Sequence, residues 1–115
     1  MKLKVFTSSG KPDFAAYKAR SFIETIYAEG YEAVKMQISE TNGFWDGNGT
    51  YTLKLWYEMK EKPIIRKFEY VCKYKSQEDA LDYLEKLAKN NYISIDVFEC
   101  SSFWKGKEVS GVVLF

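Results

Sequence analysis

The side chains that most often carry enzyme chemistry are absent or few in this sequence. None of the 115 residues is a histidine, which removes the commonest general base and the commonest metal ligand. Cys72 and Cys100 have no histidine to activate a thiolate, and they form no Cys-x-x-Cys pair. We therefore expect two buried free thiols, no metal site and no cofactor.

Acid–base chemistry by carboxylates alone is the enzyme alternative that stays open. Five acidic residues fall on predicted strands and turns, where they could approach one another: Asp46, Glu58, Glu69, Asp96 and Glu99. The interpretation we favour is that they lie on solvated strand faces and pair with lysines across strands. The sequence contains no phosphate-binding Walker loop, dinucleotide fingerprint or nucleophile elbow. We expect a protein that is not an enzyme.

A phrase of two aromatic residues, a variable residue and a glycine occurs twice, as Phe44-Trp45-Asp46-Gly47 and Phe103-Trp104-Lys105-Gly106. Large aromatic side chains in glycine-rich turns either fold back over the end of a core or stand out as contact residues. We favour core filling for these two turns and keep contact as the alternative.

Trp56 is the sharper candidate for contact with another molecule. Residues 50–60 alternate as a half-buried strand does, which places Trp56 with Thr52 and Lys54 on the face away from the predicted helices. Phe98 is a second candidate for that face. The predicted contact residues are Trp56, Phe98, Lys54 and the turn aromatics Phe44, Trp45, Phe103 and Trp104.

Composition is typical of one folded globular domain over residues 1–115, with 46% hydrophobic and 29% charged residues. Seventeen basic and sixteen acidic residues leave a net charge of +1, so no global field attracts duplex nucleic acid or an anionic membrane. The first residues lack the apolar core of a signal peptide, and no stretch is long and apolar enough to span a membrane. These features predict a soluble, cytoplasmic protein.

The periodicity of apolar residues predicts two successive units, each with the order strand, helix, strand, strand. In the first unit the strands cover 2–6, 31–40 and 50–60, and the helix covers 14–29 and ends at Gly30. In the second unit the strands cover 64–75, 93–98 and 109–115. The second helix begins at Ser76 with a capping-box pattern and ends at Asn90-Asn91.

The two units align with each other. At an offset of 61, the helix stripe and the following strand stay in step, as in Ala19 with Ala80 and Ile23 with Leu84. The offset falls to 59 at the aromatic phrase, which requires a second turn two residues shorter. We therefore predict a duplication with pseudo-repeats 1–60 and 64–115.

A helix with one apolar stripe must bury it against a sheet. The predicted fold class is α+β: a two-layer sandwich of duplicated strand-helix-strand-strand units, with six largely antiparallel strands and two helices on one face. The other face of such a sheet is solvated, paired with another chain or occupied by a ligand.

The doubled order, the glycine-bearing loop after the first strand and Gly30-Tyr31-Glu32 at the end of the first helix resemble the duplicated module of gyrase-inhibitor-like effector-binding domains. The resemblance covers topology over most of the chain. It implies an aromatic-lined cleft between the halves that binds a small, often cationic apolar molecule or a partner protein. A ferredoxin-like fold with extra strands is the competing interpretation.

Three functions remain open from the sequence. The one we favour is a non-enzymatic binding module for a partner protein, a second copy of the chain or a small apolar ligand, with an accessory or inhibitory role. The second is single-stranded nucleic-acid binding, in which bases stack on Trp56 or Phe98 and lysines such as Lys35, Lys54, Lys67 and Lys73 meet phosphates. The third is an enzyme that uses carboxylates alone.

Overall fold

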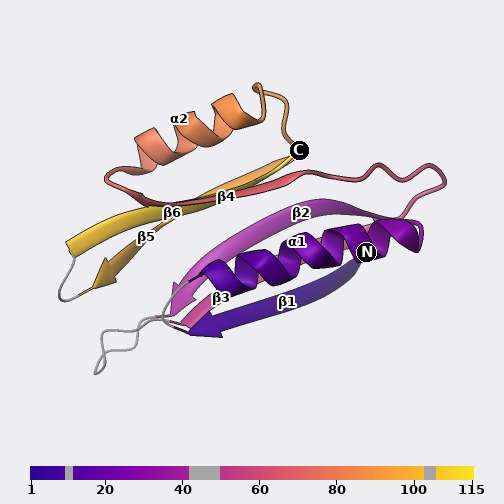
Figure 1. Ribbon diagram of the computed structural model, residues 1–115, viewed down its shortest axis with the longest axis horizontal. Coiled ribbons are helices and arrows are strands. Elements are labelled where there is room, and N and C mark those ends of the chain that lie inside the picture. Colours follow the sequence, from indigo (N-terminus) through magenta and orange to yellow (C-terminus); the bar gives the residue numbers. More distant parts are fainter. Residues whose placement is uncertain (10–11, 42–49, 103–105) are drawn as a thin grey trace.

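In the computed structural model, the described chain folds as six strands and two helices (Figure 1). The structure describes residues 1–9, 12–41, 50–102 and 106–115. The expected α+β class and the order strand-helix-strand-strand, repeated, are both confirmed. The elements are β1 Lys2–Ser9, α1 Asp13–Ala28, β2 Tyr31–Thr41, β3 Thr50–Met59, β4 Phe68–Tyr74, α2 Gln77–Leu87, β5 Ser94–Ser102 and β6 Gly106–Leu114.

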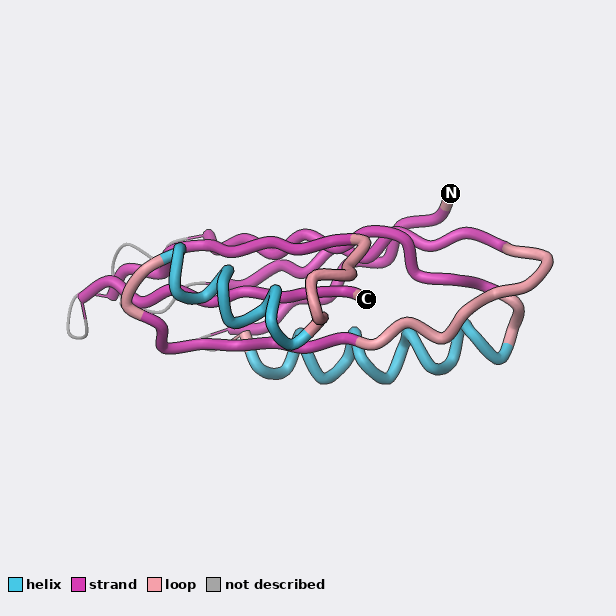
Figure 2. The backbone as a smooth tube through the Cα atoms, turned by 90° about the horizontal axis from the view of Figure 1, so that it is seen from above, coloured by secondary structure: helices cyan, strands magenta, loops and turns pink. Residues whose placement is uncertain are grey.

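The strands form two three-stranded antiparallel sheets, one from each half of the chain. The first sheet has the order β1-β3-β2 and the second the order β4-β6-β5. Each sheet has its own helix, α1 on the first and α2 on the second, and both helices run alongside the strands (Figures 1 and 2). The matching layout is what a duplication predicts, and the duplication itself stays a prediction.

Helix α1 forms because small and branched apolar residues recur on one of its sides. The buried residues of this stripe are Ala15, Ala16, Ala19, Ile23 and Ile26. They pack on inward-facing residues of the first sheet, including Phe6, Leu53 and Leu55. The three alanines allow the helix backbone to lie close to the strands. Gly30 ends the element with a φ of 91°, a backbone conformation that a glycine adopts without strain.

Helix α2 begins at the predicted cap. The Ser76 hydroxyl accepts a hydrogen bond from the Asp79 amide at 3.1 Å. Leu84 and Ala80 are buried against the second sheet, and Leu84 lies over Gly111 of β6. A Cβ atom at Gly111 would lie 2.8 Å from side-chain carbons of Leu84 and Val97, so the packing of α2 requires a glycine there.

The second sheet is buried on both faces, because the face opposite α2 joins the first half in a common core. Phe68, Val112 and Leu114 belong to the same buried cluster as the α1 stripe. The Tyr70 hydroxyl donates to Asp13 at 3.1 Å, which ties β4 to the start of α1. The halves therefore meet through packed side chains.

The predicted strand 64–75 is shorter than expected, because β4 begins only at Phe68. Residues before it bond elsewhere: the Ile64 amide donates to the Glu32 carboxylate, and Lys67 exchanges two backbone hydrogen bonds with Phe115. Lys73 has a φ of 66° and interrupts the pairing of β4 with β6. This break turns Tyr74 towards α2, where its ring packs with Tyr83 at 5.7 Å.

Candidate functional site

The outer face of the first sheet, on the side opposite α1, presents side chains on each of its three strands, most of them exposed. We call it the open face. Strand register sets its side chains in three rows across β1, β3 and β2: Leu3, Trp56 and Lys35; Val5, Lys54 and Gln37; Thr7, Thr52 and Ser39. All of them are exposed except Thr52 and Trp56, which are partly buried.

Trp56 lies at the middle of the first row and is held on both sides. Leu3, directly across on β1, is 49% exposed. On the other side the Lys35 ammonium lies over the indole, 5.1 Å from the ring centroid. Such a cation–π contact stabilises an exposed pair by about 0.5–1 kcal/mol, and it orients the indole on the sheet. The predicted placement of Trp56 with Thr52 and Lys54 on this face agrees with the register.

A β-bulge in β2 places Lys35 beside Trp56. The register shifts between Ala33 and Lys35, so that Val34 is the extra residue. Ala33 is consequently buried on the helix side, whereas strict alternation would have put it with Lys35. Without the bulge, either Lys35 or the start of β2 would face the wrong side of the sheet.

Phe98 does not share the open face. Its ring packs edge-on against buried Tyr51 at 5.8 Å, and it borders the main core. The reason is that Phe98 lies on the face of β5 that meets the first half of the molecule, with Ser94 and Asp96. The expectation that Phe98 joins Trp56 in one platform is therefore corrected.

The turn aromatics Phe44, Trp45, Phe103 and Trp104 lie outside the described residues, as does Asp46. Lys54 lies on the open face as predicted. Lys67 and Lys73 belong to the segment before β4 and to β4 itself, away from the open face.

The acidic residues considered for catalysis do not come together among the described residues. Glu58 pairs with Lys60 at 2.9 Å, Glu69 with Arg20 at 3.8 Å, and Asp96 accepts a backbone hydrogen bond. Each of these three carboxylates has its own partner, which suits a structural role better than shared acid–base chemistry.

Asp96 and Ser94 instead join the two sheets. The Ser94 hydroxyl accepts from the Met36 amide and donates to the Met36 carbonyl, both at 3.0 Å. The Asp96 carboxylate accepts from the Ile38 amide at 2.9 Å. Side chains of β5 thus accept the backbone hydrogen bonds that a neighbouring strand would otherwise accept at this edge of β2. We call this contact the seam.

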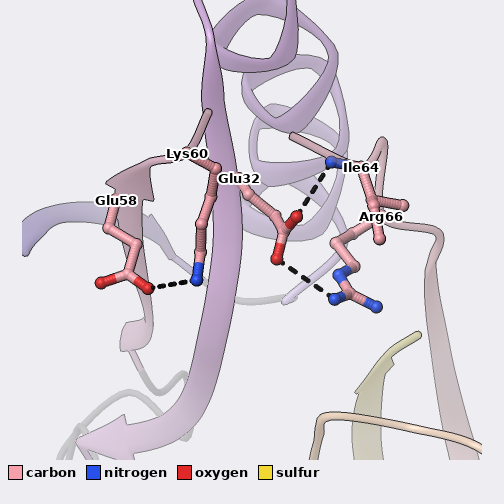
Figure 3. Close-up of polar contacts among 5 residues, drawn as sticks. All are labelled: Glu32, Glu58, Lys60, Ile64 and Arg66. Carbon is pink, nitrogen blue, oxygen red and sulfur yellow. Dashed lines mark hydrogen bonds and ion pairs between the residues drawn. The ribbon is translucent and has the colours of Figure 1, made fainter. Parts of the chain in front are cut away.

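A buried carboxylate that the sequence reasoning missed fixes the connection between the halves. Glu32 is 7% exposed, and its two oxygens accept from the Ile64 amide at 2.9 Å and from the Arg66 guanidinium at 3.1 Å (Figure 3). The pair of Glu58 and Lys60 lies beside it. Burial by itself raises the pKa of Glu32, but the Ile64 amide, Arg66 and Lys60 outweigh burial and hold it below 4.5.

The remaining reactive groups form no constellation in the described part of the chain. Cys72 is a free, partly buried thiol, and nothing is described of the Cys100 side chain. Burial, with Cys72 and Asp13 nearby, strongly raises the pKa of Tyr70. Among the described residues no three potential metal ligands gather, and neither described helix is long and apolar enough to cross a membrane.

A groove lies between α1 and β1, within the first half of the chain. It is therefore not a cleft between the two halves. Its volume is about 440 Å³, and it is open to solvent. Phe6 and Phe22 line it, with their rings in edge-on contact and their centroids 5.5 Å apart. Its rim is formed by α1 residues, namely Tyr17, Lys18, Ser21 and Thr25.

Comparison with known proteins gives no match to a protein-family model, to a curated protein or to a solved structure. The resemblance to gyrase-inhibitor-like domains therefore stays a prediction from topology.

Proposed function

We propose that this chain is a non-enzymatic binding module that holds a partner protein on the open face of its first sheet. The observation that carries the proposal is the placement of Trp56. Its indole lies partly buried between Leu3 and Lys35, on the central strand β3 of the open face, and the other residues of the three rows are mostly exposed. Tryptophans in such positions supply a large share of binding energy at protein interfaces.

The composition of the open face favours a protein over a single-stranded nucleic acid. Leu3 and Val5 put aliphatic side chains beside the indole, and these offer nothing to a phosphate. The Lys35 ammonium already lies over the ring on which a base would stack. Lys67 and Lys73, which would have extended a phosphate track, lie in the other half.

The open face also supports the non-enzymatic part of the proposal. Its lysines, Lys35 and Lys54, are exposed, whereas catalytic groups usually lie in a concave pocket with shifted pKa values. Accessory or inhibitory action on the partner, in the cytoplasm, belongs to the same proposal.

The experiment compares Trp56→Ala with Tyr27→Ala. Tyr27 is an aromatic residue of α1 that is 39% exposed and lies away from the open face, so it controls for the loss of an aromatic surface side chain. Partners captured from a cell extract by the wild-type chain would be purified and their affinities measured. We expect Trp56→Ala to weaken binding by about tenfold or more, which corresponds to about 1.4 kcal/mol, with a melting temperature within a few degrees of wild type.

Equal binding by the two variants would contradict the proposal, and so would a large loss of stability in Trp56→Ala, because Trp56 would then be a core residue. Titration with oligo-dT at low salt tests the nucleic-acid alternative. A strong change in tryptophan fluorescence that is lost in Trp56→Phe would favour that alternative.

A further inference from the structure

Strand β1 is an edge strand, and no described element pairs with its outer side. In the first sheet it bonds to β3 alone, over its full length from Lys2 to Ser9. The opposite edge of the sheet, on β2, is occupied at the seam by side chains of β5. Long edge strands of this kind are templates for another strand.

The charges that usually protect an edge are turned away from it. The Lys2 ammonium hydrogen-bonds the Tyr31 hydroxyl at 3.0 Å, and the Lys4 ammonium lies over the Phe22 ring at 5.8 Å. Both lysines thus lean over the helix side of the sheet. On the open face β1 presents Leu3 and Val5, which are 49% and 45% exposed.

We propose that a second copy of the chain pairs with β1 in the antiparallel direction, with the two-fold axis at Val5, to give one continuous six-stranded sheet. In this register Val5 faces the same residue of the other copy, Lys4 faces Phe6 and Leu3 faces Thr7. No lysine then faces a lysine. Moving the axis to Lys4 would place two ammonium groups directly opposite each other, which is unfavourable.

The charges on α1 are self-complementary in the same arrangement. Helix α1 runs opposite to β1, since Phe22 contacts Phe6 while Glu29 lies near Lys2. The two-fold axis therefore crosses α1 near residues 22–25 and sets the two helices antiparallel. Lys18 of each copy then lies opposite Glu29 of the other, so that residues i and j exchange places as an isologous interface requires.

The groove between α1 and β1 lies on the side of α1 where the second copy would pair. Three strand spacings separate the two helices by about 14 Å, which leaves room for one long side chain from each copy. Tyr17, at the groove rim and 63% exposed, is such a side chain. An eight-residue strand with one helix layer above it offers about 500 Å² per copy, near the lower limit of specific interfaces, so we expect a dimer of modest affinity.

Charge reversal tests the helix contact. Sedimentation equilibrium measures the dissociation constant of the dimer. Lys18→Glu and Glu29→Lys should each weaken the wild-type dimer about tenfold, because each change acts twice at a two-fold interface. The double variant should recover the wild-type affinity. Within one chain the two residues are eleven positions apart on the helix, about 16 Å, which exceeds the screening length of about 8 Å at physiological salt. Recovery therefore requires contact between copies.

A pair of cysteine variants tests the strand register. Under mild oxidation Val5→Cys should form a disulfide-linked dimer, since its Cβ atoms lie about 5 Å apart across the axis. Leu3→Cys, matched in exposure, should not link beyond the wild-type background, because four strand residues separate the two copies by about 13 Å.

A monomer at concentrations up to about 1 mM overturns the proposal. So does a dimer that the charge reversals leave unchanged, or a monomer that instead binds a different chain along β1. The proposal does not depend on the partner-binding role of Trp56. Trp56→Ala should keep the dimer, so the two proposals fail separately.

Discussion

The Glu32 carboxylate lies 3.1 Å from the Arg66 guanidinium, although the two residues belong to different halves of the chain. Their side chains are 8% and 20% exposed, so the ion pair is largely removed from water. The second carboxylate oxygen accepts the Ile64 amide. One buried anion therefore fixes the path of the connection between β3 and β4.

Glu32→Gln should destabilise the protein by about 2–4 kcal/mol, because Arg66 keeps its buried charge and loses the anion that balances it. The matched control is Glu58→Gln. Glu58 is 34% exposed in its pair with Lys60, and its loss should cost less than about 1 kcal/mol. Urea unfolding midpoints measure both values. Similar midpoints for the two variants would show that the Glu32 pair adds nothing.

The same carboxylate makes stability depend on pH. Because folding lowers the pKa of Glu32 below 4.5, its contribution is fully present above pH 4.5 and is lost as the pH falls through the lower, folded value. Thermal unfolding should therefore show a steeper acid decline in wild type than in Glu32→Gln. Parallel curves below pH 4.5 would contradict the assignment.

Asp96→Ala should loosen the seam, since it leaves the Ile38 amide without its acceptor at a partly buried site. We expect a loss of about 1–3 kcal/mol. Asp96→Asn keeps an acceptor oxygen and should lose less. Glu99→Ala, an exposed residue of the same strand, is the control for a removed carboxylate. An equal loss in the alanine and asparagine variants would mean that the hydrogen bond is not the cause.

Gly111→Ala should cost about 1–3 kcal/mol through overpacking. The new methyl group would meet Leu84 and Val97 at 2.8 Å and the Asp96 carbonyl oxygen at 3.0 Å, so α2 or the backbone must move. Gly30→Ala provides a contrast, because its Cβ meets nothing within 4 Å and its cost arises only from the φ of 91°. Gly30→Asn should be less destabilising than Gly30→Ala, because asparagine tolerates a positive φ. At Gly111 every other residue type brings a Cβ, so every substitution there should lose stability.

Periodicity predicted the element order and the face on which Trp56 lies, because both follow from spacing within one segment. It could not predict the division into two sheets, which depends on the Ser94 and Asp96 side chains reaching the edge of β2. It also missed the bulge at Val34, since one inserted residue leaves most of the alternation intact. Phe98 was misplaced for a related reason: alternation separates the two faces of β5 but does not say which face meets the first half.

Glu32 offered one signal that could have been used. It is a carboxylate at the start of a strand whose next buried positions are apolar, close to the chain reversal at Gly30. Its partners Ile64 and Arg66 lie more than thirty residues away, and only the packing of the connection against β2 brings them together.

The seam gives the amides of Met36 and Ile38 a special value for observing motion. Their protons are held by side chains of the second sheet, while the neighbouring amides of β2 that bond to β3 stay within one sheet. The hydrogen-exchange rates of these two amides would therefore report how often the halves separate, even while β2 stays paired with β3.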